Sequence, residues 1–269
     1  MSDQTRAADI MATVERLSGR PLPKDSGDEG LQIGSEETPV RQALVAWMGT
    51  REALLHAEKM KADLAIVHES LFYPYNVRLN PGETPDWLAW TTNRQRNEII
   101  VRARLTVLRI HGSADIISIF DDAAERLGLG GSVSGEGLRK VYEIEPVSLR
   151  ALVERVKSIS GLGHVRVSCK EKDLDRVVHR VGMPWGGLGL YTNVGYQAWA
   201  LGQGCDVLIA GEADSYGFRF SGESDVPMIE TSHESSEIPG FRKFMELLAA
   251  SHPDVTFEYH DNGNAWRWM

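Results

Sequence analysis

The sequence predicts an α/β protein whose strands form a mostly parallel sheet. Short apolar runs typical of buried strands, such as residues 62–67 and 105–110, alternate with segments whose apolar residues have helical spacing. This repeat of strand and helix favours a mostly parallel arrangement. At 269 residues, the chain is long enough for one large domain or two ordinary ones.

The expected elements follow the chain in two series. The first series holds a helix ending at Leu17, strands at 31–34, within 40–49, at 62–67 and at 105–110, and helices at 50–60, 87–104 and 115–127. Five glycines in residues 128–137 do not easily continue a helix or strand, so we expect a boundary there and two units, 1–130 and 131–269. The second series holds helices at 146–159, 194–202 and 241–251, and strands at 165–169, 177–181, 206–210 and 226–231.

Composition and charge exclude several classes of protein. Hydrophobic residues at 42% and charged residues at 25% are typical of globular proteins. The net charge of -9 counts against a nucleic-acid-binding role, although a local basic patch stays open. No apolar stretch is long enough to span a bilayer and the N-terminus lacks a secretory pattern, so we expect a cytoplasmic protein without membrane contact. Cys169 and Cys205 form no CxxC pair, so any metal should have nitrogen and oxygen ligands.

Three apolar runs are followed directly by a histidine and a carboxylate. The pairs are His68 and Glu69, His111 and Asp115, and His233 and Glu237. Ligands of open α/β sheets bind beyond the carboxyl ends of the strands, where these pairs are expected. In the last two pairs the residues are four apart, so they share one face if the segment after the strand is helical. Such donors suit Zn, Fe, Mn or Co, and a pair of ions can share a bridging carboxylate.

Each pair also has an ordinary structural interpretation. His68 fits a core histidine that donates to a backbone carbonyl, and Asp115 fits the first turn of a helix beginning near His111. Glu234 and Glu237 fit a solvated helix start.

Two segments after other strands are further candidates. Gly186-Gly187-Leu188-Gly189 could cradle a phosphate through its backbone amides, or could simply form a tight turn. Glu212 follows the strand that ends at Ala210, and it fits either a solvated loop or a group that orients a metal ligand.

These segments resemble the ordered motifs of the Nif-three-like family, whose members are often named GTP cyclohydrolase 1 type 2 homologues. The resemblance rests on residues 30–34 and 62–72, His111-x-x-x-Asp115, Gly211-Glu212 and Ser232-His233-x-x-x-Glu237. They run in the family's order from about residue 28 to about residue 240. The resemblance implies two similar three-layer α/β/α lobes with mixed, mostly parallel sheets. It also implies a dinuclear metal site between the lobes and, commonly, a ring-shaped homohexamer.

By this resemblance, the metal ligands are His68, Glu69, Asp115, His233 and Glu237. Glu237 would be the bridge, and His111 would be a further ligand or a partner of the ligands. The chain departs from the family at Glu69 and Ser70, where histidine and proline are usual. A carboxylate in place of imidazole adds negative charge and a harder oxygen donor. We therefore expect two divalent ions, Zn, Fe or Mn, with a tilt toward Mn, Fe or Mg relative to Zn.

Three functions fit this sequence. The first is a metal-dependent hydrolase of an unidentified small molecule, in which Glu212 or His111 orients the attacking water. The cyclohydrolase reaction is implied by the resemblance alone. The second is a non-catalytic metal-binding ring that stores or delivers metal or serves as a regulatory scaffold. The third is a nucleotide-binding module built on Gly186–Gly189, which would bind nucleotide equally well after metal removal.

Overall fold

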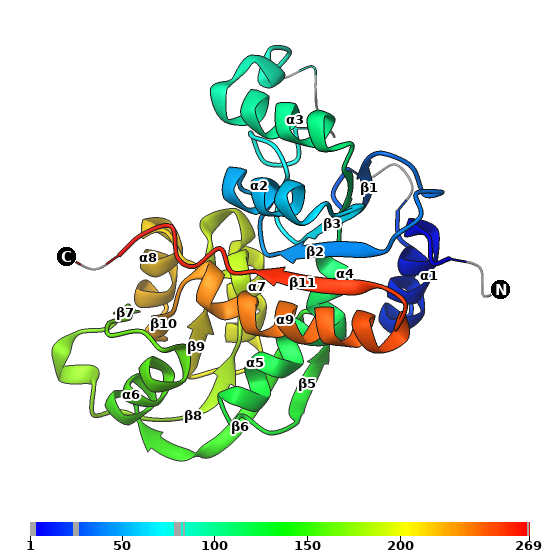
Figure 1. The fold of residues 1–269 in the computed structure, drawn as a ribbon. Coiled ribbons are helices and arrows are strands. Elements are labelled where there is room, and N and C mark those ends of the chain that lie inside the picture. The colour runs from blue at the N-terminus through cyan, green and yellow to red at the C-terminus, as the bar shows by residue number, and fades with distance from the viewer. Residues whose placement is uncertain (1–3, 24–26, 78–81, 83, 268) are drawn as a thin grey trace. The chain divides into compact units, whose positions relative to one another are not determined.

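The chain forms two compact units in a computed structural model that describes residues 4–23, 27–77, 82, 84–267 and 269 (Figure 1). Unit 1 comprises Met1–Ser118 with Phe241–Asn262, and unit 2 comprises Ile119–Gly240 with Gly263–Met269. A division of the chain at residue 130 stays a prediction.

Unit 1 is built on a five-stranded sheet with the order β1-β4-β3-β2-β11. The strands are β1 (Gly30–Ile33), β2 (Gln42–Ala46), β3 (Leu64–Val67), β4 (Thr106–Arg109) and β11 (Thr256–His260). The last four run parallel, and β1 pairs antiparallel with β4. Every residue of β3 and β4 is buried, as expected for central strands covered on both faces. Their carboxyl ends lie in register, since Val67 pairs with Arg109.

Helices cover both faces of this sheet. Figure 1 shows α2 (Arg51–Met60) and α3 (Thr91–Ala103) on one face and the unit 1 part of α9 (His233–Ser251) on the other. Helix α2 begins where the Thr50 side chain accepts a hydrogen bond from the Ala53 amide. The two helices form one buried apolar cluster with β2, β3 and β4. Helix α1 (Ala7–Ser18) packs beside the short α4 (Gly112–Ala114).

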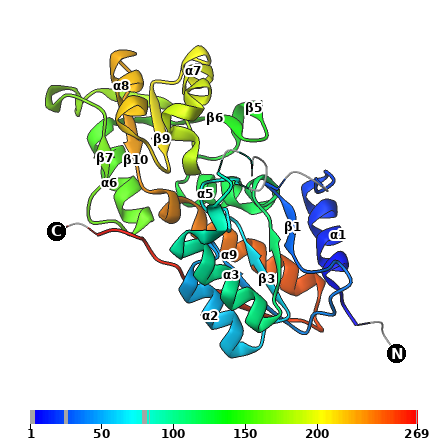
Figure 2. The same cartoon turned by 90° about the horizontal axis from the view of Figure 1, so that it is seen from above.

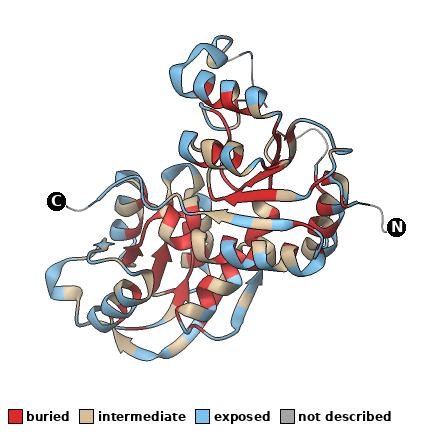
Figure 3. Ribbon diagram, viewed as in Figure 1, coloured by how far each residue is buried: buried red, intermediate tan, exposed pale blue. Residues whose placement is uncertain are grey.

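Unit 2 has a six-stranded mixed sheet with the order β5-β6-β8-β9-β10-β7. The strands are β5 (Ser132–Glu136), β6 (Arg139–Ser148), β7 (Arg166–Val167), β8 (Val177–Gly182), β9 (Val207–Ala210) and β10 (Met228–Glu230). Only β8, β9 and β10 run parallel. These central strands are the most buried, whereas the edge strand β5 is largely exposed (Figure 3).

The unit 2 sheet is also covered on both faces. Figure 2 shows α7 (Val194–Gly202) and α8 (Ser215–Glu223) on one face, with α5 (Phe120–Arg126) and α6 (Leu149–Ser160) on the other. Leu208 and Met228 pack with Ala200 of α7 in a buried apolar cluster. The molecule is thus an α/β protein with two layered lobes and mixed sheets, as the sequence and the family resemblance predict.

Most expected elements are present, and the differences have local causes. The glycine-rich span 128–137 contains β5, which forms an antiparallel hairpin with β6. Pro146 lies inside β6, so α6 begins only at Leu149, after its cap Ser148. Helix α9 begins at His233, ahead of the expected residue 241, because Ser232 Oγ accepts from the Ser235 amide at 3.0 Å. Within the described part of the chain, no helix is both long and apolar enough to cross a membrane.

Candidate metal centre

Strand β3 delivers two candidate ligands at its carboxyl end. The amides of His68 and Glu69 both donate to the Trp47 carbonyl, at 3.0 and 2.8 Å. These bonds turn the chain out of the sheet, and both side chains are buried. A buried carboxylate is costly without a partner of positive charge. Arg109, with one nitrogen 4.0 Å from Glu69, supplies part of this positive charge, and a bound metal ion would supply more.

The His68 ring is held in one tautomer. Its Nδ1 lies 3.0 Å from the Ile110 carbonyl oxygen, which can only accept a hydrogen bond, so Nδ1 carries the proton. The lone pair of the neutral ring is then on Nε2, and this atom lies 3.8 Å from Oδ1 of Asp115. His68 thus makes the carbonyl bond of an ordinary core histidine and also directs Nε2 toward a carboxylate.

His111 has a similar arrangement beyond the end of β4. Its Nδ1 lies 3.3 Å from Asp28, and its Nε2 lies 3.9 Å from Oε1 of Glu69. Burial acts to raise the pKa of Asp28, but the hydrogen bond and charge of His111 and the charge of Arg109 hold it well below its usual value. Asp28 is therefore an ionised acceptor that orients His111.

Arg109 connects these groups from the last position of β4. It is 1% exposed, and its Nε donates to the His68 carbonyl at 3.0 Å. The rest of the guanidinium donates to Asp28, Asn76 and the Tyr75 hydroxyl, and one nitrogen lies 4.0 Å from Glu69. A buried guanidinium is tolerated when its donors are used in this way. Arg109 thus fixes the backbone of one candidate ligand and faces the side chain of another.

Asp115 is positioned by a helical segment that Glu29 holds at its start. Glu29 is buried, accepts from the Ser113 amide at 2.7 Å and pairs with Arg20 at 2.7 Å. A carboxylate at a helix N-terminus satisfies an amide that has no partner within the helix. Asp115 begins the π-helical turn Asp115–Ile119 and is also buried. Its Oδ1 lies 3.8 Å from Nε2 of His68, and its amide donates to the His111 carbonyl at 3.2 Å.

Unit 2 carries a second cluster at the start of α9. Ser232 caps this helix, so His233 and Glu237 lie one turn apart on the same face. Nε2 of His233 is 3.2 Å from Oε2 of Glu237, and Nδ1 is 3.0 Å from Oε2 of Glu212. The hydrogen bond from His233 outweighs burial and lowers the pKa of Glu212. An ionised Glu212 accepts from Nδ1, which leaves Nε2 directed at Glu237.

The glycine segment after β8 approaches this second cluster closely. Gly186 has a φ of +52°, and a Cβ there would overlap Oε1 of Glu237. A Cβ on Gly187 would lie 3.2 Å from the His233 ring. The indole of Trp185 donates to the Ser236 carbonyl at 2.8 Å and fixes the segment against α9. Close packing on the histidine and carboxylate therefore accounts for glycine at 186 and 187.

The donor chemistry of both clusters fits a divalent metal ion. In unit 1, single ligand atoms of His68, Glu69 and His111 lie within 4.8 Å of one another. Zn–N and Zn–O bonds are about 2.0–2.2 Å, so two ligands of one ion are separated by at most about 4.4 Å. The 3.9 Å between His111 and Glu69 is inside this limit. The unit 2 cluster offers one imidazole nitrogen and a buried carboxylate.

The predicted residues fall into two groups by unit. Unit 1 brings together His68, Glu69, Asp115 and His111, and unit 2 brings together Glu212, His233 and Glu237. Sequence reasoning missed Asp28, Arg109 and Tyr75. An arginine inside the apolar strand of residues 105–110 could have indicated this network, because a buried guanidinium needs organised acceptors.

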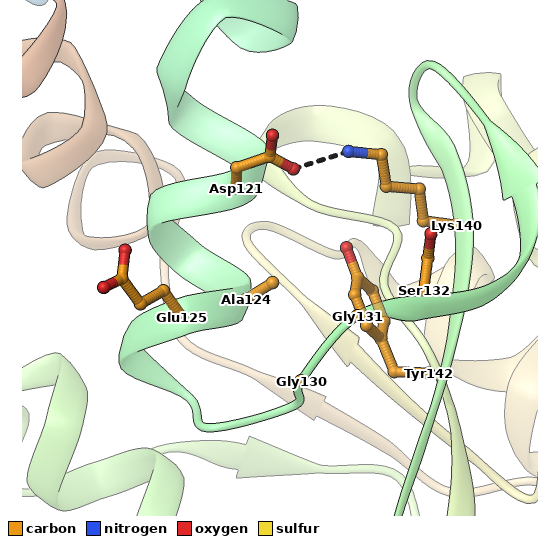
Figure 4. A pocket seen from close by; sticks show the side chains of 8 residues that line it. All are labelled: Asp121, Ala124, Glu125, Gly130, Gly131, Ser132, Lys140 and Tyr142. Carbon is orange, nitrogen blue, oxygen red and sulfur yellow. Dashed lines mark hydrogen bonds and ion pairs between the residues drawn. The ribbon is translucent and has the colours of Figure 1, made fainter.

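A separate pocket of about 420 Å³ lies in unit 2 between α5 and the β5–β6 hairpin (Figure 4). Lys140 donates to Asp121 across it at 2.5 Å. Burial, aided by the charge of Asp121, raises the pKa of Tyr142 to about 12. The lining residues are Asp121, Ala124, Glu125, Gly130, Gly131, Ser132, Lys140 and Tyr142. The predicted site residues are absent from this lining.

The fold and the two clusters define an α/β protein with histidine–carboxylate groups able to hold metal. Residues 5–262 match the family model described as Duf34/NIF3 (NGG1p interacting factor 3). The chain therefore belongs to the Duf34/NIF3 family, and the resemblance inferred from its motifs is confirmed.

Relatives and solved structures agree with this assignment. The GTP cyclohydrolase 1 type 2 homolog of Streptococcus pneumoniae is 25% identical over 220 residues, which cover 77% of this chain and 76% of that protein. A Staphylococcus aureus hypothetical protein has a TM-score of 0.79 and 16% identity, covering 99% of this chain and 100% of that one. A Bacillus cereus protein related to NIF3 has a TM-score of 0.77 and 16% identity, covering 100% and 99%. The structural likenesses show a shared fold.

Proposed function

We propose that the protein binds two divalent metal ions and acts as a metal-dependent hydrolase. One observation carries the metal-binding part. In His68, His111 and His233, Nδ1 faces an acceptor, and Nε2 lies 3.2–3.9 Å from a carboxylate oxygen. A nitrogen lone pair and a carboxylate repel each other unless a cation or a proton lies between them. Three such arrangements in one chain favour metal ions.

The proposed pair of ions has more ligands than either cluster supplies alone. The family resemblance supports His68, Glu69, Asp115, His233 and Glu237 as joint ligands of a pair of ions, with Glu237 as the bridge. Two ions with one bridging carboxylate are typically about 3.5–4 Å apart. Mn²⁺ ions this close are magnetically coupled, so the electron paramagnetic resonance spectrum of Mn²⁺-loaded protein tests the joint centre. Isolated Mn²⁺ signals would restrict the proposal to separate ions in the two clusters.

Divalent ions bound by such residues lower the pKa of a water molecule and polarise a substrate oxygen. The chain's own groups would prepare this chemistry. Glu212 holds the His233 ring through Nδ1, and its side chain is 44% exposed, so it can also meet a water molecule. Asp28 and Arg109 hold the groups of unit 1. Orientation of ligands by such partners typically affects metal affinity or activity 10- to 100-fold.

The names of the relatives indicate which substrates to test first. Their name, GTP cyclohydrolase 1 type 2 homolog, makes purine nucleotides the first compounds to test. Hydrolysis of phosphoesters is the second reaction class, because paired metal ions recur in phosphatases and nucleases.

The test is an assay of metal-loaded protein against nucleotide and phosphoester panels. His233→Ala and Glu237→Ala should abolish turnover, while Glu223→Gln, an exposed change on α8, should leave it intact. Turnover that survives both ligand changes would refute the hydrolase assignment. Metal binding without turnover on any panel would instead support the second candidate, a metal-storing, metal-delivering or regulatory scaffold.

The family resemblance adds a homohexameric ring to the proposal. Six chains of 29.9 kDa would give a particle of about 180 kDa. Light scattering coupled to size-exclusion chromatography measures this mass directly. A monomer of about 30 kDa that retains its metal would refute the ring and leave metal binding standing.

A further inference from the structure

We propose that the pocket between α5 and the β5–β6 hairpin binds a small zwitterion, a molecule of the free amino acid type. Tyr142 and Lys140 bind its carboxylate, and Asp121 binds its ammonium group. This inference concerns unit 2 alone and depends neither on metal binding nor on hydrolysis. The pocket shares no lining residue with the histidine–carboxylate cluster of unit 2.

The secondary structure directs the lining side chains into one space. Lys140 and Tyr142 are two positions apart in β6, so they lie on the same face of the sheet. Ser132 of β5 pairs with Tyr142 and shares that face. Asp121 and Ala124 are three positions apart in α5, so they lie on one face of the helix. Figure 4 shows them pointing across the pocket toward Lys140 and Tyr142, so regular elements hold both walls.

The hydroxyl of Tyr142 is a buried donor without a partner. Tyr142 is 2% exposed, and its hydroxyl oxygen has no hydrogen-bond partner among the residues that the structure describes. Native proteins nearly always satisfy such a group, because leaving it unpaired lowers stability. Burial raises its pKa to about 12, so the oxygen keeps its proton at neutral pH. The hydroxyl is therefore ready to donate to an acceptor atom of a ligand in the pocket.

A pair of opposite charges lies beside this donor. The Lys140 ammonium is 2.5 Å from the Asp121 carboxylate, and the two side chains are 20% and 67% exposed. The pair is thus nearer to solvent than the Tyr142 hydroxyl, and ion pairs with so exposed a partner contribute little to stability. A simple anion is attracted by Lys140 but repelled by Asp121, and a simple cation meets the reverse. A molecule with both a carboxylate and an ammonium group complements both charges.

The volume and the apolar part of the lining limit the size of the ligand. A volume of about 420 Å³ falls in the range of about 300–1,000 Å³ that is typical of small-molecule sites. Ala124, two glycines and the Tyr142 ring offer apolar surface to a ligand side chain. A Cβ on Gly130 or Gly131 would meet no atom of the described residues within 4 Å, so this wall leaves room. An amino acid with an apolar side chain of moderate size therefore fits the pocket.

The experiment titrates the free amino acids into the protein by isothermal titration calorimetry. Each amino acid that binds is compared with two analogues, one without the amino group and one without the carboxylate. We expect both analogues to bind at least about tenfold more weakly, because each loses a charge-assisted hydrogen bond.

Three variants locate the binding site. Tyr142→Phe should weaken binding about 10- to 100-fold and leave the free energy of unfolding equal or higher, because it removes only the unpaired hydroxyl. Lys140→Met should also weaken binding. The matched control is Lys157→Met, which removes a lysine paired with Glu154 on α6 and should bind normally.

The other outcomes would overturn the inference. Absence of binding by every amino acid at millimolar concentration, equal binding of the analogue without the amino group, or unchanged binding by Lys140→Met would exclude a zwitterion site here. A clear loss of stability in Tyr142→Phe would show that the hydroxyl has a partner within the fold. If the variants fail to fold, the unaltered protein with ¹³C-labelled tyrosine rings gives a second measurement. Binding should shift a tyrosine resonance, and binding that leaves every tyrosine resonance unchanged would contradict the inference.

Discussion

Glu212 and His233 form a carboxylate–imidazole pair, with Oε2 of the glutamate 3.0 Å from Nδ1 of the histidine. This contact sets the ring so that Nε2 meets Glu237 at 3.2 Å. The neighbouring segment of Gly186 and Gly187 lies close enough to limit movement of both ligands. The unit 2 cluster is therefore organised by its own surroundings.

Removing the charge of Glu212 should weaken metal binding at this cluster. Glu212→Gln cannot accept from Nδ1 as strongly, so we expect a 10- to 100-fold loss of affinity with little change in thermal stability. A competition titration with a chelator measures the effect. The control is the exposed Glu223→Gln, which should bind metal normally. Equal affinity in the two variants would contradict the role given to Glu212.

Adding a methyl group at Gly186 should displace Glu237. Gly186→Ala places a Cβ against Oε1 of Glu237 at a φ of +52°, whereas Gly137→Ala has a φ of +58° and open space around its Cβ. Both variants should lose about 1–2 kcal/mol of folding stability, because a side chain is strained in the left-handed backbone conformation. Only Gly186→Ala should also lose metal. Urea unfolding and metal titration of the pair separate the two effects, and normal metal binding by Gly186→Ala would exclude the steric account.

Replacing Arg109 should destabilise unit 1 strongly. Arg109→Met leaves the buried carboxylate of Glu69 and the Asp28 acceptor without the guanidinium, and breaking a buried pair typically costs about 3–5 kcal/mol. Arg102→Met removes the exposed pair with Glu58 and should change stability little. Chemical denaturation measures both variants. Similar stabilities would show that the Arg109 network is not structural.

Acid should reduce stability through His252. Burial lowers its pKa below 6.5, although Asp254 and Asp9 act in the opposite direction, and the ring bonds to Thr13 at 2.9 Å. A histidine with a lowered folded-state pKa contributes stability above its unfolded pKa and loses it as the pH falls through the folded value. His252→Gln should therefore show a smaller loss of unfolding free energy between pH 7 and pH 5. An unchanged pH slope would contradict this assignment.

Local sequence was enough to predict the strand ends that carry the clusters. Apolar runs before His68, His111 and His233 are compatible with buried central strands, and the four-residue spacing of His233 and Glu237 predicts one helix face. Short edge strands such as β11 were missed because their side chains are only half buried, which weakens the hydrophobic pattern.

Contacts between distant residues were beyond sequence reasoning. Asp28 meets His111 across 83 positions, and local sequence patterns carry no information about a contact at that separation. The glycine cluster at Gly186 is evident in the sequence, but the sequence does not decide its cause. It fits both a phosphate cradle and a tight turn. The structure explains this glycine by its closeness to Glu237.

Elemental analysis of protein purified without chelator and then supplied with Mn²⁺, Fe²⁺ or Zn²⁺ measures whether the chain holds two metal ions. We expect two divalent ions per chain, fewer in Glu237→Ala and the same number in Glu223→Gln. Protein that is correctly folded yet remains free of metal under all three conditions would contradict this expectation.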